Sequence, residues 1–355
     1  MSIEAGYKGG RVIILSSRWA DEGRVESDRL RFGDLAALLS SLGLPAVHRT
    51  FASERELRQL LESERPPLAF SAAHRSSPDG TGANVHAVFE NLRIPYVGSS
   101  PETIDLALSK PRLKDLWKKR GILTPDHFVI RRDSGGGLSG MEALCSATNY
   151  PYFVKPASEG NSRGIGYDSV VHNAAELEAK ASAVAEEFGE ALVEVFVGGG
   201  GAKEFTVAVV GNGSTALVMP ARISFLSAAR SGAITVEDKD GHRTCALPIG
   251  DAVLSARIEE LARVAFCAAG VRDYARGDFI LCRDRLYAIE INGQPMMPDR
   301  WFAACCAGRG MDARTYPAAV FLAGMTRLES KGLLLAPIPD AMRDLVQRGS
   351  ETRIA

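Results

Sequence analysis

Short apolar runs alternate with helix-like stretches over the first hundred residues of this 355-residue chain. The runs have the length and composition of buried strands. They are 11–17, 45–50, 68–72 and 95–97. The helix-like stretches are 28–43, a polar segment between the second and third runs, and 82–92. Such alternation predicts a parallel sheet covered by helices.

The pattern changes after about residue 100. The stretch 101–121 is helix-like and rich in lysine, and strand-like segments dominate from Tyr152 onward. Those segments are 152–155, 165–171, 191–197, 204–210, 216–222 and a hairpin of 274–282 with 285–292. The later helix-like stretches are 174–188, 252–269, 312–325 and 338–347. Because one hydrophobic core rarely grows beyond about 250–300 residues, the chain is expected to form two or three domains.

Charge and cysteine content narrow the kinds of partner. The 42 basic and 43 acidic side chains leave a net charge of −1, so no overall basic surface points to nucleic acid. No apolar stretch approaches the roughly 20 residues of a membrane span, and the N-terminus lacks a signal-peptide pattern. The six cysteines show no C-x-x-C spacing and are expected to be reduced. We therefore expect a soluble, cytoplasmic protein.

A lysine followed by a glycine-containing loop forms the first candidate site. The strand at 152–155 ends in Lys155, Pro156 terminates it, and Gly160 and Gly164 follow. Glycine lets backbone N–H groups approach phosphate oxygens, and a lysine adds positive charge. The spacing is neither a Walker A loop nor a Rossmann fingerprint. An ordinary surface turn is the alternative interpretation.

The hairpin forms the second candidate site. Side chains alternate along strands, so Arg276 and Asp278 share one face, as do Glu290 and Asn292. A turn at 283–284 brings the two pairs together. Carboxylate and amide oxygens suit Mg²⁺, and the guanidinium suits an anionic substrate or oxyanion. The alternative is a solvated polar face with a salt bridge.

A third, weaker signal is an apolar strand that meets a run of four glycines at 198–201. The strand 192–197 could present backbone groups to an adenine edge. Glu204, beyond the glycines, could bind ribose hydroxyls. Glu194 and Glu204 could equally be surface acids at strand edges.

Taken in order, these motifs resemble the ATP-grasp superfamily, most closely its D-alanine–D-alanine ligase-like branch. The resemblance spans about residues 68–300 and includes 70–74, 79–81 and 94–99 in an N-terminal substrate domain. It implies an α/β (α+β) ATP-grasp fold, with an N-terminal parallel α/β domain and two α+β domains that enclose ATP. The implied boundaries are 1–108, 109–198 and 199–355.

The resemblance also implies roles for individual residues. The ATP-binding residues would be Lys110, Lys155, Glu159, Gly160, Asn161, Ser162, Gly164, Glu194, Val195, Val197 and Glu204. The ligands of two Mg²⁺ ions, with Mn²⁺ as an alternative, would be Asp278, Glu290 and Asn292. The catalytic residues would be Arg276, Ser162 and Lys239. The substrate-binding residues would be His74, Arg276, Asn292 and Gly293.

The implied reaction is ATP-dependent ligation of a carboxylate to an amine. The carboxylate attacks the γ-phosphate of ATP to give an acyl phosphate, the amine attacks its carbonyl carbon, and phosphate leaves. The substrates would be amino acids or a specialised metabolite. The resemblance also implies a homodimer.

Several positions depart from the family pattern. Met296 stands where a glycine would help form the oxyanion hole, and 299–301 lacks the serine that reads the second D-alanine. The loop 234–239 is short, and neither Glu22 nor Glu26 lies in the usual amine-binding pattern. These departures favour another amine or carboxylate as substrate. A true D-alanine–D-alanine ligase and a non-catalytic nucleotide-binding protein are the alternatives.

Overall fold

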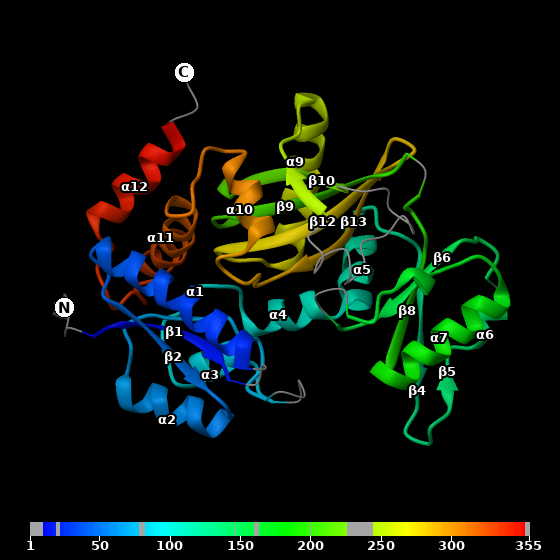
Figure 1. The fold of residues 1–355 in the computed structure, drawn as a ribbon, viewed down its shortest axis with the longest axis horizontal. Coiled ribbons are helices and arrows are strands. Elements are labelled where there is room, and N and C mark those ends of the chain that lie inside the picture. The colour runs from blue at the N-terminus through cyan, green and yellow to red at the C-terminus, as the bar shows by residue number, and fades with distance from the viewer. Residues whose placement is uncertain are drawn as a thin grey trace.

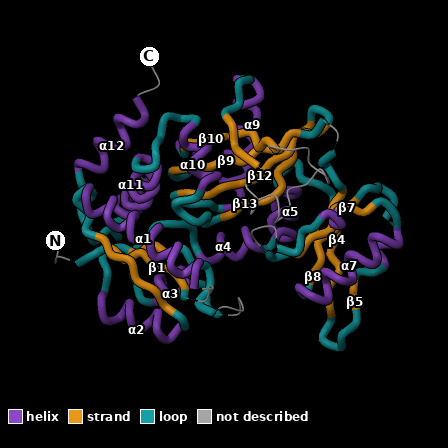
Figure 2. Tube along the Cα trace, viewed as in Figure 1, coloured by secondary structure: helices purple, strands orange, loops and turns teal. Residues whose placement is uncertain are grey.

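Three sheets organise the protein (Figures 1 and 2). The computed structural model describes residues 10–18, 22–77, 82–145, 147–159, 163–199, 201–225 and 244–351. One sheet is parallel and two are antiparallel. The chain is thus a mixed α/β protein of the predicted fold class.

The N-terminal sheet has the order β2-β1-β3 and is parallel throughout. Its strands are β1 (Val12–Ser17), β2 (Ala46–Phe51) and β3 (Ala69–Ser71). Helices α1 (Glu22–Ser41), α2 (Glu54–Glu64) and α3 (Val85–Asn91) connect and cover it. Val12 and Ile14 share a core with α1, whereas Ile13 and Leu15 share one with α2 and α3. This alternation buries both faces of β1 and confirms a parallel sheet. The strand predicted at 95–97 was wrong, because only Tyr96 forms an isolated bridge, to Ala69.

The smaller antiparallel sheet lies on the right in Figure 1 and has the order β5-β4-β8-β6-β7. Its strands are β4 (His127–Arg132), β5 (Leu138–Ser139), β6 (Tyr152–Pro156), β7 (Val170–Val171) and β8 (Glu190–Val195). Helix α7 (Ala174–Phe188) packs Leu177 and Ala181 against Ile130 and Val154, and α6 (Glu142–Cys145) lies beside it. The opposite face of β6 and β8 is therefore left to carry polar side chains.

The larger antiparallel sheet has the order β11-β10-β9-β12-β13. Its strands are β9 (Lys203–Val210), β10 (Leu217–Phe225), β11 (Thr244–Leu247), β12 (Tyr274–Cys282) and β13 (Arg285–Asn292). Val207 and Val209 face α9 (Ala252–Ala269), whereas Ala208 and Val210 belong to the core that includes α10 (Arg300–Ala307). Helices α11 (Thr315–Ser330) and α12 (Asp340–Glu351) pack in that same core, beside the N-terminal sheet (Figure 1).

The hairpin β12–β13 turns at the predicted residues. Arg283 and Asp284 have φ values of 48° and 61°, the left-handed conformation that a two-residue hairpin turn of type I′ requires at both positions. The bounds predicted for α7, α9, β12 and β13 are confirmed.

Some predicted elements were wrong or incomplete. The stretch 101–121 forms two helices, α4 (Pro101–Leu108) and α5 (Lys110–Lys119), because Pro111 cannot donate a backbone hydrogen bond within a continuous helix. In the segment 165–171 only β7 is a strand, preceded by a 3₁₀ turn at Tyr167–Ser169. Strands β4 and β11 and helix α10 were not predicted.

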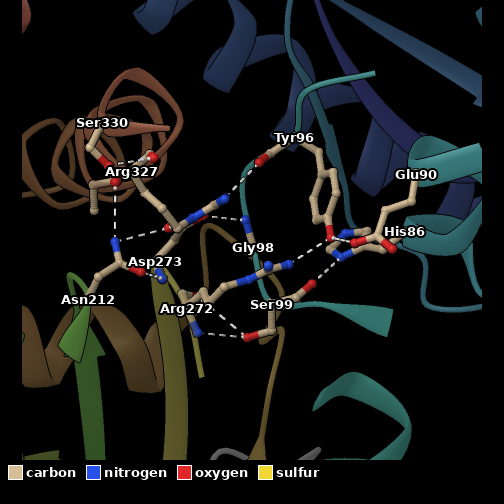
Figure 3. A network of polar contacts seen from close by, with 11 residues as sticks. His86, Glu90, Tyr96, Gly98, Ser99, Asn212, Arg272, Asp273, Arg327 and Ser330 are labelled. Carbon is tan, nitrogen blue, oxygen red and sulfur yellow. Dashed lines mark hydrogen bonds and ion pairs between the residues drawn. The ribbon is translucent and has the colours of Figure 1, made fainter. Parts of the chain in front are cut away.

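A buried polar network around Asp273, directly before β12, joins the loop after β3, the turn after β9 and helix α11 (Figure 3). Arg327 of α11 donates to both carboxylate oxygens of Asp273 at 2.7 Å. The backbone N–H of Gly98 and the amide of Asn212 donate to the same carboxylate at 2.7 and 3.1 Å. Arg272 reaches the hydroxyl of Tyr96 at 2.7 Å. The network thus ties the loop after β3 and helix α11 to the start of the strand that carries Arg276.

None of the helices among the described residues is both long and apolar enough to cross a bilayer. The thiols of Cys245, Cys267, Cys282, Cys305 and Cys306 are free. Burial raises the pKa of Cys305 to about 12, so its thiol is neutral at physiological pH.

Candidate active site

A cavity lies between the two antiparallel sheets. Strands β6 and β8 form one wall, and β9, β12 and β13 form the other. The predicted site residues that line it are Lys155, Glu194, Val195, Val197, Glu204, Arg276, Asp278 and Glu290. The structure therefore brings residues from 155 to 290, distant in sequence, into one site.

The predicted polar patch on the hairpin is present. Arg276 is the direct cross-strand partner of Asn292, and Asp278 is the partner of Glu290. A β-bulge follows between Asp278 and Phe279. Counted from the two-residue turn, Asp278 would face Ile289. The bulge adds one residue on β13, so Asp278 instead faces Glu290 and the four polar side chains lie on one face of the hairpin.

Carboxylates surround the guanidinium of Arg276. Its Nη1 lies 3.3 Å from Oδ1 of Asp299, and its Nε lies 3.9 Å from Oδ1 of Asp278. Burial alone would lower the pKa of Arg276, but Asp278, Asp299 and Glu290 raise it. The guanidinium is therefore a fixed positive charge at the cavity wall.

Asp299 was not recognised from the sequence as part of this site. Its Oδ1 caps α10 by accepting from the backbone N–H groups of Trp301 and Phe302, at 3.0 and 2.9 Å. The same oxygen accepts from Arg276. Asp299 thereby couples the start of α10 to the orientation of the arginine. An aspartate directly before a helix is the signal that could have revealed the cap.

The two predicted phosphate-binding lysines lie close together. The backbone N–H of Lys110 donates to the carbonyl of Ala157 at 3.0 Å, which fixes the start of α5 beside the end of β6. The ammonium of Lys110 contacts the carbonyl of Glu159 and lies 3.8 Å from a carboxylate oxygen of Glu290. Burial lowers the pKa of Lys110, and Glu290 opposes that shift.

A third lysine, Lys114, was missed. Its side chain is completely buried, and Nζ lies 2.9 Å from Oε1 of Glu194. Burial lowers the pKa of Lys114 to about 8, so the group is still mainly charged near neutral pH. Its spacing could have revealed it, because Lys114 shares a helix face with the apolar Trp117 and with Lys110.

Glu194 lies between two of these lysines. Its Oε2 is 3.3 Å from Nζ of Lys155, and its other oxygen meets Lys114. Burial alone would raise the pKa of Glu194, but the charges of Lys114 and Lys155 outweigh it and lower that pKa. The interpretation of Glu194 as a surface acid was therefore wrong.

The hairpin offers oxygen ligands suited to a hard cation. Asp278 and Glu290 contribute carboxylates, and Oδ1 of Asn292 accepts one hydrogen bond, from the N–H of Gln294 at 3.1 Å. A carbonyl oxygen has a second lone pair available for a metal. Within the described ranges, no three His, Cys, Asp or Glu side chains converge as a metal site. Two carboxylates and an amide still fit Mg²⁺, which takes few protein ligands.

Three other predicted residues are not among those that line the cavity. Nε2 of His74 is 2.9 Å from the carbonyl of Gln294, so it connects the N-terminal part to the segment after β13. Gly293 packs against α4, where an added Cβ would lie 3.2 Å from Cβ of Ala107. Glu159 contributes its carbonyl to Lys110.

Gly164 is required for packing. Its φ is +75°, and an added Cβ would lie 2.5 Å from Cγ of Pro156. Only glycine combines that conformation with so close an approach. The predicted residues Gly160, Asn161, Ser162 and Lys239, and the side chains of Glu22 and Glu26, lie outside the described part of the chain.

The two departures after Asn292 have different structural consequences. Met296 directs its sulfur to the guanidinium of Arg31 on α1, and it is not among the residues that line the cavity. Trp301 does line the cavity, and Arg300 lies over its ring at 4.9 Å. The methionine therefore leaves the cavity open, whereas the tryptophan narrows it.

Comparisons with known proteins agree with this geometry. Residues 116–316 match the family model described as D-ala D-ala ligase C-terminus. The chain is 31% identical over 301 residues to the D-alanine–D-alanine ligase of Polaromonas sp. strain JS666, covering 82% of this chain and 83% of the relative. The chain belongs to the D-alanine–D-alanine ligase family. A Saccharophagus degradans D-alanine–D-alanine ligase is 29% identical over 82% of this chain and 86% of its own length.

The fold agrees as well. A crystal structure of the Bacillus anthracis D-alanine–D-alanine ligase, complexed with ATP, superimposes with a TM-score of 0.71 at 20% identity. It covers 91% of this chain and all of the other. The D-alanine–D-alanine ligase-like protein is thus an ATP-grasp enzyme that forms C–N bonds. These relatives support the alternative prediction, ligation of D-alanine, better than the broader one.

Proposed function

We propose that the protein is a D-alanine–D-alanine ligase that uses ATP and Mg²⁺. Relatives with this activity in their names match most of the chain, including both sheets that enclose the cavity. The observation that carries the proposal is the wall opposite Lys155, where Arg276 and Asn292 pair directly beside Asp278 and Glu290. One wall offers cations for phosphate, and the other offers metal ligands and an oxyanion partner.

The lysines would hold the phosphates of ATP. Lys155 lines the cavity, Lys110 lies on a neighbouring segment, and both are buried. Buried ammonium groups interact strongly with phosphate because little water screens them. Both lysines would orient the γ-phosphate toward the carboxylate of the first substrate, whose attack gives an acyl phosphate.

The hairpin β12–β13 would bind the metal ion and stabilise the charges that form at the reacting atoms. Asp278, Glu290 and Asn292 would hold Mg²⁺, which supplies charge neutralisation to the phosphates when bound. Arg276 would donate to the substrate carboxylate and to the oxyanion that forms when the amine attacks the acyl carbon. The pairing with Asp299 fixes one side of the guanidinium in advance, so less reorganisation is needed during the reaction.

An apolar end of the cavity suits a nucleobase. Phe153 and Phe196 stack with ring centroids 6.1 Å apart, and both line the cavity. The backbone of Val195 and Val197 would meet the adenine edge, and Glu204 the ribose. Aromatic and aliphatic walls with a few polar groups are typical of cofactor sites.

The direct test is phosphate release from ATP in the presence of D-alanine, with mass detection of the dipeptide. We expect release that requires both ATP and D-alanine, and a product with the mass of D-alanyl-D-alanine. L-alanine and glycine serve as controls for the acceptor. Phosphate release with another amine or carboxylate but none with D-alanine would contradict the proposal.

One observation favours a second candidate, a ligase with a different amine or carboxylate substrate. Trp301 lies in the segment 299–301, which lacks the serine of the family pattern, and it lines the cavity; Asp299 occupies one side of Arg276. The indole of Trp301 makes the site smaller, and the carboxylate of Asp299 makes it more acidic. A pooled screen of amino acids and amines for ATP-dependent phosphate release distinguishes the two candidates.

Trp301 also yields a prediction about substrate size. Trp301→Ala removes the indole from the cavity wall, so bulkier acceptors should be accepted. We expect kcat/KM for D-phenylalanine relative to D-alanine to rise by about tenfold or more. Phe302→Leu, a change in the adjoining α10 residue that does not line the cavity, is the matched control. An unchanged ratio would mean that Trp301 does not bound the acceptor site.

We further propose three domains with boundaries near residues 108 and 198, and a homodimer. β8 ends in the smaller sheet at Val195 and β9 begins in the larger one at Lys203, which supports the second boundary. Helices α11 and α12 share a core with the N-terminal sheet, so the first and third domains would be packed firmly together. Light scattering in solution tests the dimer.

A further inference from the structure

A buried cluster of two lysines and one glutamate lies beneath the cavity. Glu194 of β8 forms two ion pairs. One of its carboxylate oxygens lies 2.9 Å from Nζ of Lys114, and the other lies 3.3 Å from Nζ of Lys155. Their side chains are 5%, 0% and 4% exposed, respectively. One buried carboxylate therefore balances two buried ammonium groups, which leaves one positive charge in excess.

The two lysines have different access to the cavity. Lys155 and Glu194 line it, whereas Lys114 lies behind Glu194 and is not part of the wall. Lys114 also donates to Oγ1 of Thr124 at 3.0 Å, which holds its ammonium in place. Only Lys155 can thus turn toward an anion in the cavity, and Lys114 must stay with the glutamate.

A buried charge is stable only when it is paired. If Lys155 moves to a phosphate oxygen, Glu194 loses one of its two cations and needs the other. Without Lys114, Lys155 would be the only cation within ion-pairing distance of Glu194 among the described residues, and moving it would leave that carboxylate unpaired. The phosphate and the glutamate would then compete for a single lysine.

We propose that Lys114 is a positioning residue for nucleotide binding, which holds Glu194 from behind and so frees Lys155 for the phosphates of ATP. This proposal rests on the proposed function only in that the cavity binds ATP. The proposed role of Lys114 does not depend on which carboxylate and amine the enzyme joins. Lys114 itself touches neither nucleotide nor substrate.

A purely structural role for Lys114 predicts a different result. Replacing a buried lysine would then lower stability, and a second change at Glu194 would not restore ATP binding. The positioning role predicts strong coupling between the two sites, since removal of the carboxylate removes the competition for Lys155. A double-mutant cycle separates these two outcomes.

The experiment measures the dissociation constant of ATP by calorimetry for the wild type, Lys114→Met, Glu194→Gln and the double variant. We expect Lys114→Met to weaken ATP binding by about tenfold or more. The double variant should bind ATP within about threefold of Glu194→Gln alone. Lys118→Met is the matched control, because Lys118 lies on the same helix but forms only an exposed pair with Asp126 at 2.9 Å. It should change affinity by less than about threefold.

Thermal melting checks that each variant folds. If Lys114→Met is unfolded, Thr124→Val provides a smaller perturbation, since it removes only the hydrogen bond to Lys114. This variant should weaken ATP binding by about two- to fivefold. Two outcomes would overturn the role of Lys114. One is unchanged ATP affinity in a folded Lys114→Met variant. The other is an equal loss of ATP affinity from Lys114→Met in the wild type and in the Glu194→Gln background. A wild type that does not bind ATP would instead overturn the proposed function.

Discussion

Glu290→Gln is expected to lower kcat by about 10²- to 10³-fold. The substitution keeps the shape of the side chain but removes the negative charge directly opposite Asp278 on the hairpin. That charge is half of the carboxylate pair proposed to hold Mg²⁺, and it also lies 3.8 Å from the ammonium of Lys110. The loss should appear in phosphate release at saturating ATP and D-alanine.

The expected result separates chemistry from folding. Glu290 lies at the cavity wall rather than in an apolar core, so the melting temperature should change little. Glu190→Gln is a suitable control, because Glu190 lies on β8 in an exposed pair with Arg131 at 2.7 Å. Activity of Glu290→Gln within threefold of the wild type would rule out the metal assignment.

Asp273→Asn is expected to destabilise the protein by about 3–5 kcal/mol. Asp273 is completely buried and accepts hydrogen bonds from Arg327, Gly98 and Asn212 (Figure 3). The amide would leave the guanidinium of Arg327, whose side chain is only 9% exposed, without a counter-charge. The measurement is the shift of the urea or thermal unfolding transition.

An exposed pair of the same type gives the comparison. Asp284→Asn breaks the contact of Asp284 with Arg257, which is 2.9 Å long and exposed to solvent, and should cost no more than about 1 kcal/mol. Removing both charges with Asp273→Asn and Arg327→Met should recover part of the stability lost in the single variant. Equal effects at the buried and exposed pairs would contradict the structural importance of the network.

A change at Asp273 should also reach the active site. Asp273 directly precedes β12, on which Arg276 and Asp278 follow within five residues. Its hydrogen bonds anchor the start of that strand to α11 and to the loop after β3. The buried network thus supports the hairpin as well as the overall fold.

Several features of the site could be predicted because they depend on local sequence. The two-residue turn and the alternation of side chains predicted that Asp278 lies opposite the region of Glu290 and Asn292, but the exact pairing of Asp278 with Glu290 requires the β-bulge that the structure shows. Strand length and Pro156 likewise predicted that Lys155 lies near the end of a strand. The parallel N-terminal sheet followed from alternating strands and helices.

Contacts between distant segments could not be predicted in this way. Lys114 and Lys118 look alike on a helix, and only packing of α5 against β8 buries one and exposes the other. The direction of the Met296 side chain depends on Arg31, 265 residues earlier in the chain. The sequence pattern could not reveal that the Met296 side chain lies outside the cavity wall.

The sequence by itself determined the hairpin, which polar residues share a face within each of its strands, and the order of the motifs, because side-chain alternation and turn chemistry act over a few residues. Only the tertiary structure decided that these motifs enclose a cavity, that Glu194 is shared by two buried lysines, and that Asp273 joins helix α11 to the loop after β3. Those features require segments far apart in the chain to pack together. Their geometry is set by burial and charge pairing across the whole fold, which no short pattern contains.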